Sequence, residues 1–355
     1  MSNPSHLPPV NCWVLLDGRR GHENQALGLA QSLARLHDIT LKTHRLNVNP
    51  LLSALPVPLQ RPLGAQLTRY GFEADIKKAD IIIGCGRQTI APLRQIKRAY
   101  PDCFTVYIQN PQIAAEHFDL VIAPRHDDLS GPNVEAAIGS PSKITPQTLK
   151  DSAQYFSERL EAFPRPQAAI LIGGPSKIYS LPPIAVDNHI HHAQRLLDAG
   201  YSLLISTSRR TPAHARQKWK ALTERNSEHI WFYDALDNPH ETKPDIITNP
   251  YPAFLSSAEI ILVTQESTNM LTEACLTGKT VFTLEMHENR KYRHKTHKFR
   301  AFHQSLNNRC HIAPFTYPFE PRSYEPLNET PLLALKLWQR FLSHKSAYPQ
   351  TPQKA

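Results

Sequence analysis

The sequence has few cysteines, and none of them is spaced for a metal site or a disulfide framework. The five are scattered between Cys12 and Cys310, and no two show the CxxC spacing of a structural zinc site. An odd, dispersed set of this kind predicts free thiols and a reducing compartment.

Long apolar runs are also missing. No stretch approaches the roughly 20 apolar residues that a membrane-spanning helix needs. The first residues, MSNPSHLPPVN, lack the basic region followed by an apolar stretch that marks a secretory signal. These absences predict a soluble, cytoplasmic protein that is at most peripheral to a membrane.

Several ligand-binding motifs are absent as well. The eighteen histidines form no HExxH pattern, the first predicted strand is not followed by GxGxxG, and no helix-turn-helix, RNP or zinc-finger pattern occurs. We therefore expect no metal centre, no bound NAD and no nucleic-acid partner. The formal net charge of +9 instead favours small phosphate-bearing ligands, because dispersed Lys and Arg attract anions.

Apolar segments of strand length alternate with amphipathic segments of helix length in both halves of the chain. A strand over residues 12–16 precedes a helix over 23–36, and a second such series begins with a strand over 168–172. This alternation predicts the α/β class, with two parallel sheets that are each flanked by helices. His189, His191 and His192 are expected at the surface of a helix. The expected parts are an N-terminal domain (1–145), a linker (146–166), a C-terminal domain (167–330) and a final helix and tail (331–355).

The segment from Ser256 to Glu285 predicts a strand, a tight loop, a helix, a second tight loop and a strand. Ser267 or Thr268 is the expected N-cap of the helix, and Gly278 is its expected end. Free N–H groups and the helix dipole at such a start form an anion site. Glu273, one to two turns further on, is placed to accept hydrogen bonds from ribose hydroxyls. The alternative is an ordinary βαβ unit whose caps only end the helix.

Polar loops follow other predicted strands of the second half. In α/β sheets, ligands bind at the carboxyl ends of strands. The loop at Gly173-Gly174 offers backbone N–H groups, and the loop at Ser208-Arg209 adds hydroxyls and guanidinium groups that suit phosphate. The expected nucleotide-binding and diphosphate-binding residues are Gly173, Gly174, Ser176, Ser208, Arg209, Ser267, Thr268, Asn269 and Glu273.

The loop after the first predicted strand carries Asp, Arg, His and Glu side chains together with two glycines. Such a set suits ligand orientation and general base chemistry, and the alternative is a helix start with solvated charges. The candidate general bases, which the sequence does not rank, are Asp17, His22, Glu23 and, after a later strand, Asp127. The expected acceptor-side residues are Gly18, Arg19, Gly21, Asn24, Gly86 and Arg87.

These motifs, read in order from Trp13 to Glu285, resemble a known family. The matching pieces are WVLLDGRRGHENQALGLA, IIIGCGRQTIAP, AILIGGPSK, LLISTSRRTP and TQESTNMLTEACLTGKTVFTLE. The family comprises the plant elongated-mitochondria (mitochondrial fission) protein and its bacterial relatives. The resemblance implies a GT-B-like fold of two facing Rossmann-like domains. At Gln265-Glu266 this sequence departs from the small residue and Asp that we expect in relatives.

Three functions remain open. The first, which the resemblance implies for bacterial members, is a glycosyltransferase that uses a nucleotide sugar. Its expected acceptor is a glycan or glycolipid of the cell envelope, such as lipopolysaccharide. Its expected location is the cytoplasm, with peripheral contact at the cytoplasmic face of the inner membrane. The transferase needs no cofactor and no metal, because Arg side chains and helix dipoles would stabilise the departing phosphate. The second is a noncatalytic recruitment protein that uses the basic segment Arg290 to Arg300, and the third is a nucleotide-sugar epimerase. The polar loops favour the transferase, for which Glu273→Ala is expected to weaken nucleotide binding without unfolding the protein.

Overall fold

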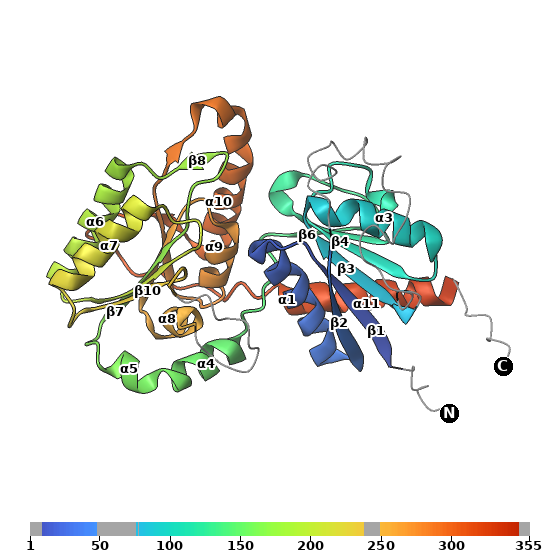
Figure 1. Ribbon diagram of the computed structural model, residues 1–355, viewed down its shortest axis with the longest axis horizontal. Coiled ribbons are helices and arrows are strands. Elements are labelled where there is room, and N and C mark those ends of the chain that lie inside the picture. Colours follow the sequence, from blue (N-terminus) through green and yellow to red (C-terminus); the bar gives the residue numbers. More distant parts are fainter. Residues whose placement is uncertain (1–8, 48–75, 77, 238–248, 348–355) are drawn as a thin grey trace. The chain divides into compact units, whose positions relative to one another are not determined.

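The structure, a computed structural model, describes residues 9–47, 76, 78–237 and 249–347. It divides into two compact units: unit 1 comprises Met1–Lys143 and Asn328–Ala355, and unit 2 comprises Ile144–Leu327. Each unit contains one six-stranded sheet in which every pair of neighbouring strands is parallel (Figure 1). The predicted α/β class with two parallel sheets is confirmed.

The sheet of unit 1 has the strand order β2-β1-β3-β4-β5-β6. Its strands are β1 (Val10–Leu16), β2 (Ile39–Arg45), β3 (Ile81–Cys85), β4 (Phe104–Ile108), β5 (Leu120–Pro124) and β6 (Val134–Ala137). Buried side chains of the central strands alternate between two apolar clusters, so helices cover both faces. The helices α1 (Arg20–Leu36) and α11 (Thr330–Ala347) contribute to one cluster, and α3 (Ile90–Ala99) contributes to the other.

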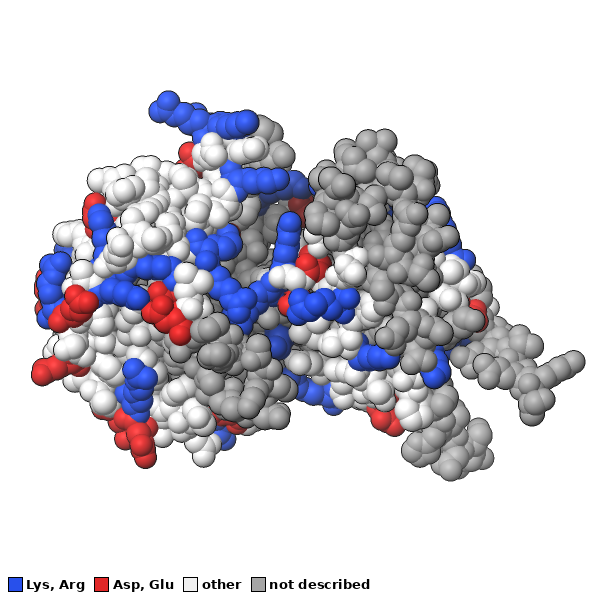
Figure 2. Space-filling model, in the orientation of Figure 1, with Lys and Arg blue, Asp and Glu red and all other residues white. Residues whose placement is uncertain are grey.

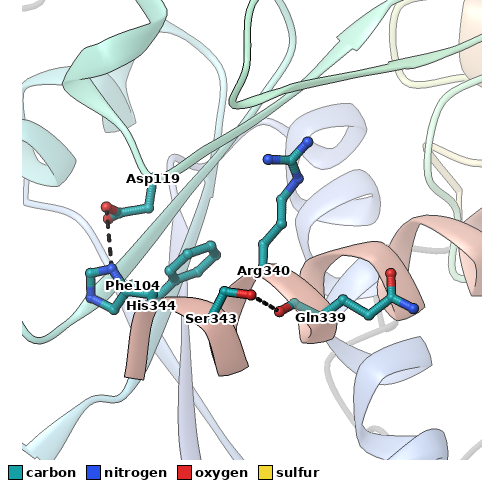
Figure 3. Close-up of a pocket in the computed structure, with 6 residues that line it drawn as sticks. All are labelled: Phe104, Asp119, Gln339, Arg340, Ser343 and His344. Carbon is teal, nitrogen blue, oxygen red and sulfur yellow. Dashed lines mark hydrogen bonds and ion pairs between the residues drawn. The ribbon is translucent and has the colours of Figure 1, made fainter. Parts of the chain in front are cut away.

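Helix α11 completes unit 1, although it lies at the far end of the sequence. The ring of Phe341 contacts that of Phe104 edge-on, with 6.0 Å between centroids, and Lys345 Nζ lies 2.7 Å from Asp80 Oδ1. A cavity of about 340 Å³ lies beside this contact, and His344 Nδ1 is 3.8 Å from Asp119 Oδ1. Figure 3 shows six of the residues that line the cavity. Phe104 and Asp119 lie at the amino ends of β4 and β5, so this cavity is at the edge of the sheet opposite to the predicted polar loops. The helix that was expected as a separate part thus packs into the core of unit 1, and the expected tail from residue 348 onward lies outside the described residues.

The sheet of unit 2 has the strand order β10-β9-β7-β11-β12-β14. Its strands are β7 (Gln167–Ile172), β9 (Ser202–Thr207), β10 (Ile230–Asp234), β11 (Ile260–Thr264), β12 (Thr280–Leu284) and β14 (Ala313–Pro314). One apolar cluster joins this sheet to α6 (Pro183–Asp198) and α7 (Ala213–Arg225), while α8 (Tyr251–Ser257) and α9 (Thr268–Cys275) contact other residues of its strands.

Further elements surround this sheet. A two-stranded antiparallel ribbon joins β8 (Tyr179–Ser180) to β13 (His287–Glu288), and η7 (Arg290–Lys295) and α10 (Thr296–Cys310) follow it. The expected linker forms α4 (Pro146–Tyr155) and α5 (Ser157–Glu161), of which α4 contacts α8, so these residues belong to unit 2.

The order of strands reverses at one point in each sheet. In unit 1, the chain leaves β1 toward β2 on one side and continues with β3 on the other. In unit 2, β9 and β10 lie on one side of β7, and β11 and β12 lie on the other. Open α/β sheets bind ligands at the carboxyl ends of the strands that flank such a reversal. The loops after β1 and β3, and those after β7 and β11, are therefore the loops at which this topology favours a ligand site.

His189 is not at the surface of α6, where it was expected. It is 2% exposed, and its Nε2 lies 2.7 Å from the carbonyl oxygen of Glu285. The helical pattern places His189 on the same face as Val186 and Ala193, both of which are buried in the apolar cluster. A histidine on an apolar helix face is buried together with that face, and a hydrogen bond to a backbone carbonyl oxygen reduces the free-energy cost of burying the imidazole.

Candidate active site

An aspartate–histidine pair follows β1 in unit 1. Nδ1 of His22 lies 2.7 Å from Oδ2 of Asp17. The side chain of Asp17 is 1% exposed and that of His22 is 21% exposed, so the carboxylate is enclosed while the imidazole reaches solvent. A carboxylate at Nδ1 holds the proton on that nitrogen and leaves Nε2 as the proton acceptor.

Two glycines and Glu23 complete the surroundings of this pair. A Cβ at Gly86, after β3, would lie 2.1 Å from Nδ1 of His22, so only glycine allows the loop to approach the ring. Oε1 of Glu23 accepts a hydrogen bond of 3.0 Å from the N–H of Gly18, whose φ is +80°. Three of the four candidate bases, Asp17, His22 and Glu23, are thus close together. The carboxylates of Asp17 and Glu23 also hold the loop, through their contacts with His22 and with the N–H of Gly18.

Asp127, the fourth candidate base, lies in η6 (Arg125–Asp127) directly after β5. Burial raises the pKa of the Tyr107 phenol above its ordinary value, and charges at Cys85, Asp17 and Asp127 raise it further. Because β1 and β5 are parallel strands of one sheet, Asp127 and the Asp17–His22 pair, which follow them, lie at the same edge of that sheet.

The other expected acceptor-side residues lie around the start of α1 and after β3. Arg19 and Arg87 are exposed, and Gly21 and Asn24 are half-buried. The sequence interpretation missed Gln25, which is 5% exposed. Its Oε1 accepts from Cys85 Sγ at 3.3 Å and from Gln109 Nε2 at 3.5 Å, so it ties the ends of β3 and β4 to α1.

In unit 2, the glycine loop after β7 is closed by side chains from β11 and its following loop. The N–H of Gly173 donates to Thr264 Oγ1 at 2.8 Å, and the N–H of Gly174 donates to Glu266 Oε1 at 2.8 Å. A Cβ at Gly173 would lie 1.8 Å from Glu266 Oε1. Both N–H groups that the sequence assigned to phosphate are therefore occupied by protein oxygen atoms in this structure.

Glu266 is the most unusual side chain of this edge. It is fully enclosed, with 0% of its side chain exposed, and Oε1 also lies 3.5 Å from Nη2 of Arg210. Oε2 is buried and has no hydrogen-bond partner among the residues that the structure describes. Burial raises the pKa of Glu266 to about 7, although hydrogen bonding to Thr264, the Gly174 N–H and the charge of Arg210 act in the opposite direction.

Arg210, rather than the expected Arg209, reaches the glycine loop. Its Nη1 donates to the carbonyl oxygens of Gly174 at 3.3 Å and Pro175 at 3.2 Å. Arg209 is exposed. The sequence shows two adjacent arginines, and only the turn of the backbone decides which one points at β7.

Hydrogen bonds from buried side chains fix the conformation of the loop that carries Ser208. Thr211 Oγ1 accepts from the N–H of Ser208 at 2.9 Å and donates to the carbonyl oxygen of Gly173 at 2.6 Å. Buried Arg216 donates to the carbonyl oxygens of Ser208 and Thr211 and forms an ion pair with Asp234. Such a network fixes the Ser208 hydroxyl and its neighbours before any ligand arrives.

The start of α9 has the expected cap. Ser267 is the N-cap, and its hydroxyl accepts from the N–H of Met270 at 3.4 Å. Thr268 and Asn269 form the half-buried first turn of the helix. After β7, Ser176 has a comparable turn-forming role, since its hydroxyl accepts from two backbone N–H groups.

Glu273 is more enclosed than the sequence interpretation assumed. It is 6% exposed, and Tyr251 Oη donates to its Oε2 at 2.7 Å. Burial and the nearby carboxylate raise the pKa of the Tyr251 phenol well above its ordinary value. Alanine at position 273 would leave this hydroxyl without its partner, so glutamine is the sharper substitution for testing a ribose contact.

The two parallel six-stranded sheets, with their polar loops at both strand-order reversals, define the class of the protein. The fold is that of the GT-B glycosyltransferases and of related epimerases. Solved structures with this fold include UDP-GlcNAc 2-epimerase from Methanocaldococcus jannaschii in complex with UDP-GlcNAc and UDP (TM-score 0.53, 11% identity, 93% of this chain and 99% of that chain). They also include the glycotransferase of kitacinnamycin (TM-score 0.50, 10% identity, 96% of this chain and 95% of that chain).

The family model described as Mitochondrial fission ELM1 matches residues 20–341, and the chain belongs to this family. Mitochondrial fission protein ELM1 of Arabidopsis thaliana is 28% identical over 300 residues, which cover 76% of this chain. The match spans 65% of the length of the Arabidopsis protein. Uncharacterized protein RP120 of Rickettsia prowazekii (strain Madrid E) is 26% identical over 365 residues, covering 92% of this chain and 97% of that protein.

Proposed function

We propose that this protein is a nucleotide-sugar-dependent glycosyltransferase that acts on a glycan or glycolipid acceptor of the cell envelope. The observation that carries the proposal is the Asp17–His22 pair at the strand-order reversal of unit 1, with 2.7 Å between Oδ2 and Nδ1. A recruitment protein has no need of an imidazole held by an enclosed carboxylate, whereas such a pair is well suited to accept a proton from a hydroxyl.

In the proposed reaction, Nε2 of His22 accepts the proton of an acceptor hydroxyl. Asp17 keeps the proton of Nδ1 in place and stabilises the imidazolium that forms, as a buried carboxylate does in hydrolytic triads. The acceptor oxygen bonds to the anomeric carbon, and the bond from that carbon to the diphosphate breaks. A base of this kind fits inversion at the anomeric carbon.

Unit 2 is proposed to bind the nucleotide sugar. The N-terminal end of α9, capped by Ser267, and the guanidinium groups of Arg209 and Arg210 supply positive potential for a diphosphate. Glu273 is proposed to accept from the ribose hydroxyls. With these charges the leaving diphosphate is stabilised without a metal, so we propose metal-independent transfer.

Two alternatives share the fold. The M. jannaschii structure is that of an epimerase, and the name of the Arabidopsis relative refers to mitochondrial fission. An epimerase would convert one nucleotide sugar into another, or release a free sugar, without an acceptor. A recruitment protein would bind neither donor nor acceptor.

The first test is a thermal-shift panel of UDP-GlcNAc, UDP-glucose, GDP-mannose and ADP-glucose with the wild type and Glu273→Gln. We expect one nucleotide to raise the melting temperature of the wild type and to have a smaller effect on the variant. Tyr251→Phe is the matched control, because it removes the hydroxyl partner of Glu273 and leaves the carboxylate. Four negative results with the wild type would instead favour the recruitment protein.

We also propose that the basic segment 290–300 brings unit 2 to an anionic membrane surface. Arg290, Lys291 and Arg293 are exposed, and Arg300 is paired with Glu288 at 3.0 Å. Figure 2 shows Lys and Arg side chains projecting from the end of unit 2 beyond α10. No helix in the described part of the chain is long and apolar enough to cross a membrane. Each basic residue near an anionic surface contributes about 1 kcal/mol.

Cosedimentation with vesicles of phosphatidylglycerol and phosphatidylcholine tests this contact. We expect the wild type to bind at low salt and the triple variant Arg290→Glu, Lys291→Glu, Arg293→Glu to bind at least tenfold more weakly. Equal binding of both proteins would exclude this segment as the membrane contact.

A further inference from the structure

The buried carboxyl of Glu266 lies within the proposed donor site but has no role in the reaction described above. Oε1 accepts from the N–H of Gly174 at 2.8 Å and lies 3.5 Å from Nη2 of Arg210. Oε2 has no partner among the described residues. A buried carboxylate oxygen without a donor is costly, and protonation removes the charge and supplies an O–H that a ligand oxygen can accept from.

The surroundings of Glu266 divide into a fixed part and a movable part. Gly174 is fixed, because a Cβ there would lie 2.2 Å from the carbonyl oxygen of Arg210 and the two loops are in close contact. The guanidinium of Arg210 is movable, since its side chain is 53% exposed. An incoming diphosphate would attract this guanidinium more strongly than one carboxylate does, because it carries two negative charges.

The titratable groups that face this region come from several elements. Arg210 comes from the loop after β9, and its charge favours the ionised carboxyl. Tyr179 on β8 is close enough for the charge of Glu266 to raise the pKa of its phenol, after the larger effects of burial and Glu288. His303 on α10 contacts the carbonyl oxygen of Gln265 at 2.8 Å, and burial lowers the pKa of this imidazole, which favours its neutral form. Arg210 is thus the cation in contact with Glu266 among the described residues.

We propose that Glu266 takes up a proton from solvent when the donor diphosphate binds, and that its protonated Oε2 then donates a hydrogen bond to a phosphate oxygen. Oε1 keeps its hydrogen bond from Gly174, and Arg210 turns from Glu266 to the ligand. Glu266 is thereby a positioning residue for the diphosphate. This inference rests on the proposed function, since it requires a nucleotide sugar in unit 2.

The ionisation of the free protein sets the size of the effect. Burial holds the pKa of Glu266 at about 7, and the negative charges of a bound diphosphate raise it further. At pH 8 the carboxyl of Glu266 is mostly ionised in the free protein, so the binding of each ligand takes up about 0.4–0.8 proton. At pH 6 the free protein already holds the proton, and the uptake falls to about 0.1.

Isothermal titration calorimetry in buffers of different ionisation enthalpy measures this uptake directly. The ligands are the four nucleotide sugars of the thermal-shift panel, whose diphosphates do not titrate between pH 6 and 8. We expect uptake at pH 8 in the wild type and none in Glu266→Gln, whose amide resembles the protonated acid. Glu266→Gln should bind up to about tenfold more tightly than the wild type at pH 8 and equally at pH 6. Glu288→Gln, which removes a more exposed carboxylate, should behave as the wild type does.

The outcomes separate this inference from the proposed function. Binding of a nucleotide sugar without proton uptake at pH 8 would overturn the inference and leave the transferase in place. Loss of binding by folded Glu266→Gln at both pH values would also overturn it, because the negative charge would then be what the ligand needs. Absence of binding by the wild type would overturn both.

Discussion

At the scale of single residues, the groups in contact with each candidate base indicate which of them can accept a proton from the acceptor. Asp17, His22 and Glu23 all appeared in the sequence as candidate bases. In the structure, Asp17 is enclosed against Nδ1 of His22, and Glu23 accepts from the N–H of Gly18. We therefore propose His22 as the base and Asp17 as the residue that orients it.

Substitutions at these three positions test this assignment. His22→Gln and Asp17→Asn should each slow glycosyl transfer by about 10²–10⁴-fold, as losses of a base or of its orienting carboxylate do. Glu23→Gln keeps an oxygen for the N–H of Gly18 and should reduce the rate by less than tenfold. Initial rates with the donor identified by the thermal-shift panel measure this order. A larger loss in Glu23→Gln than in His22→Gln would transfer the role of base to Glu23.

Two buried groups, His189 and Glu266, make opposite contributions to the pH dependence of the free energy of unfolding. Burial lowers the pKa of His189 to about 4 from an ordinary value of 6.5. The unfolded chain therefore binds this proton more readily, and the free energy of unfolding falls as pH drops from 6.5 to 4. The pKa of Glu266 is raised to about 7 from 4.5, so its contribution falls as pH rises from 4.5 to 7.

His189→Gln should reduce the acid sensitivity of the protein. The shift of the His189 pKa corresponds to about 3 kcal/mol between pH 6.5 and 4, which the variant no longer loses. Melting temperatures of both proteins between pH 4 and pH 7.5 measure the difference. An unchanged slope in the variant would show that other groups govern acid unfolding.

The residues of the site that the sequence did not reveal are those whose role depends on a neighbour from another loop. Glu266 was visible only as an acid after a buried strand, and its contact with Gly174 depends on the adjacency of β7 and β11. Arg210 was indistinguishable from Arg209 in sequence. The loops of the candidate site and the types of residue in them could be predicted from the sequence, whereas the contacts between side chains of different loops could not.

At the scale of elements, the buried parallel strands were the easiest to predict. β1, β7 and β11 are apolar runs that end at polar loops, and all residues of β7 and β11 are buried. The short edge strands β6 and β14 were missed, because two to four residues give no periodicity. The apolar spacing of residues 290–306 predicts one helix, but the segment begins as η7, where Tyr292 has non-helical dihedral angles.

The contact between β7 and the loop after β11 leads to a stability prediction. Gly173→Ala places a methyl group 1.8 Å from Glu266 Oε1, so the buried Glu266 side chain must move from its position against Gly174. We expect a loss of about 1–3 kcal/mol in the free energy of unfolding. Gly131→Ala is the control, because its nearest neighbour would be a flexible Val134 methyl at 3.3 Å. Urea unfolding of both variants decides, and equal stabilities would contradict the close contact.

At the scale of the whole molecule, the chain returns at its end to the unit where it began. The sequence predicted that helix α11 exists but not where it packs, because amphipathic spacing identifies a buried face without identifying its partner. In the structure, Leu337 of α11 is 0% exposed in the core of unit 1.

Leu337→Ala should therefore destabilise unit 1. Removing a fully buried leucine costs about 2–5 kcal/mol. Leu335→Ala, on the same helix but 42% exposed, should cost less than about 0.5 kcal/mol. Hydrogen exchange of unit 1 amides compares the two variants, and equal protection would show that α11 is not part of this core.

We propose that the protein transfers a sugar from a nucleotide donor with His22 as the base. The most direct measurement is the release of nucleoside diphosphate from the four nucleotide sugars, with and without a lipid-linked glycan extract. We predict release from one of the four that depends on the extract and is at least about 100-fold slower in His22→Gln. No release from any of them by the wild type, or equal rates in the wild type and His22→Gln, would contradict the claim.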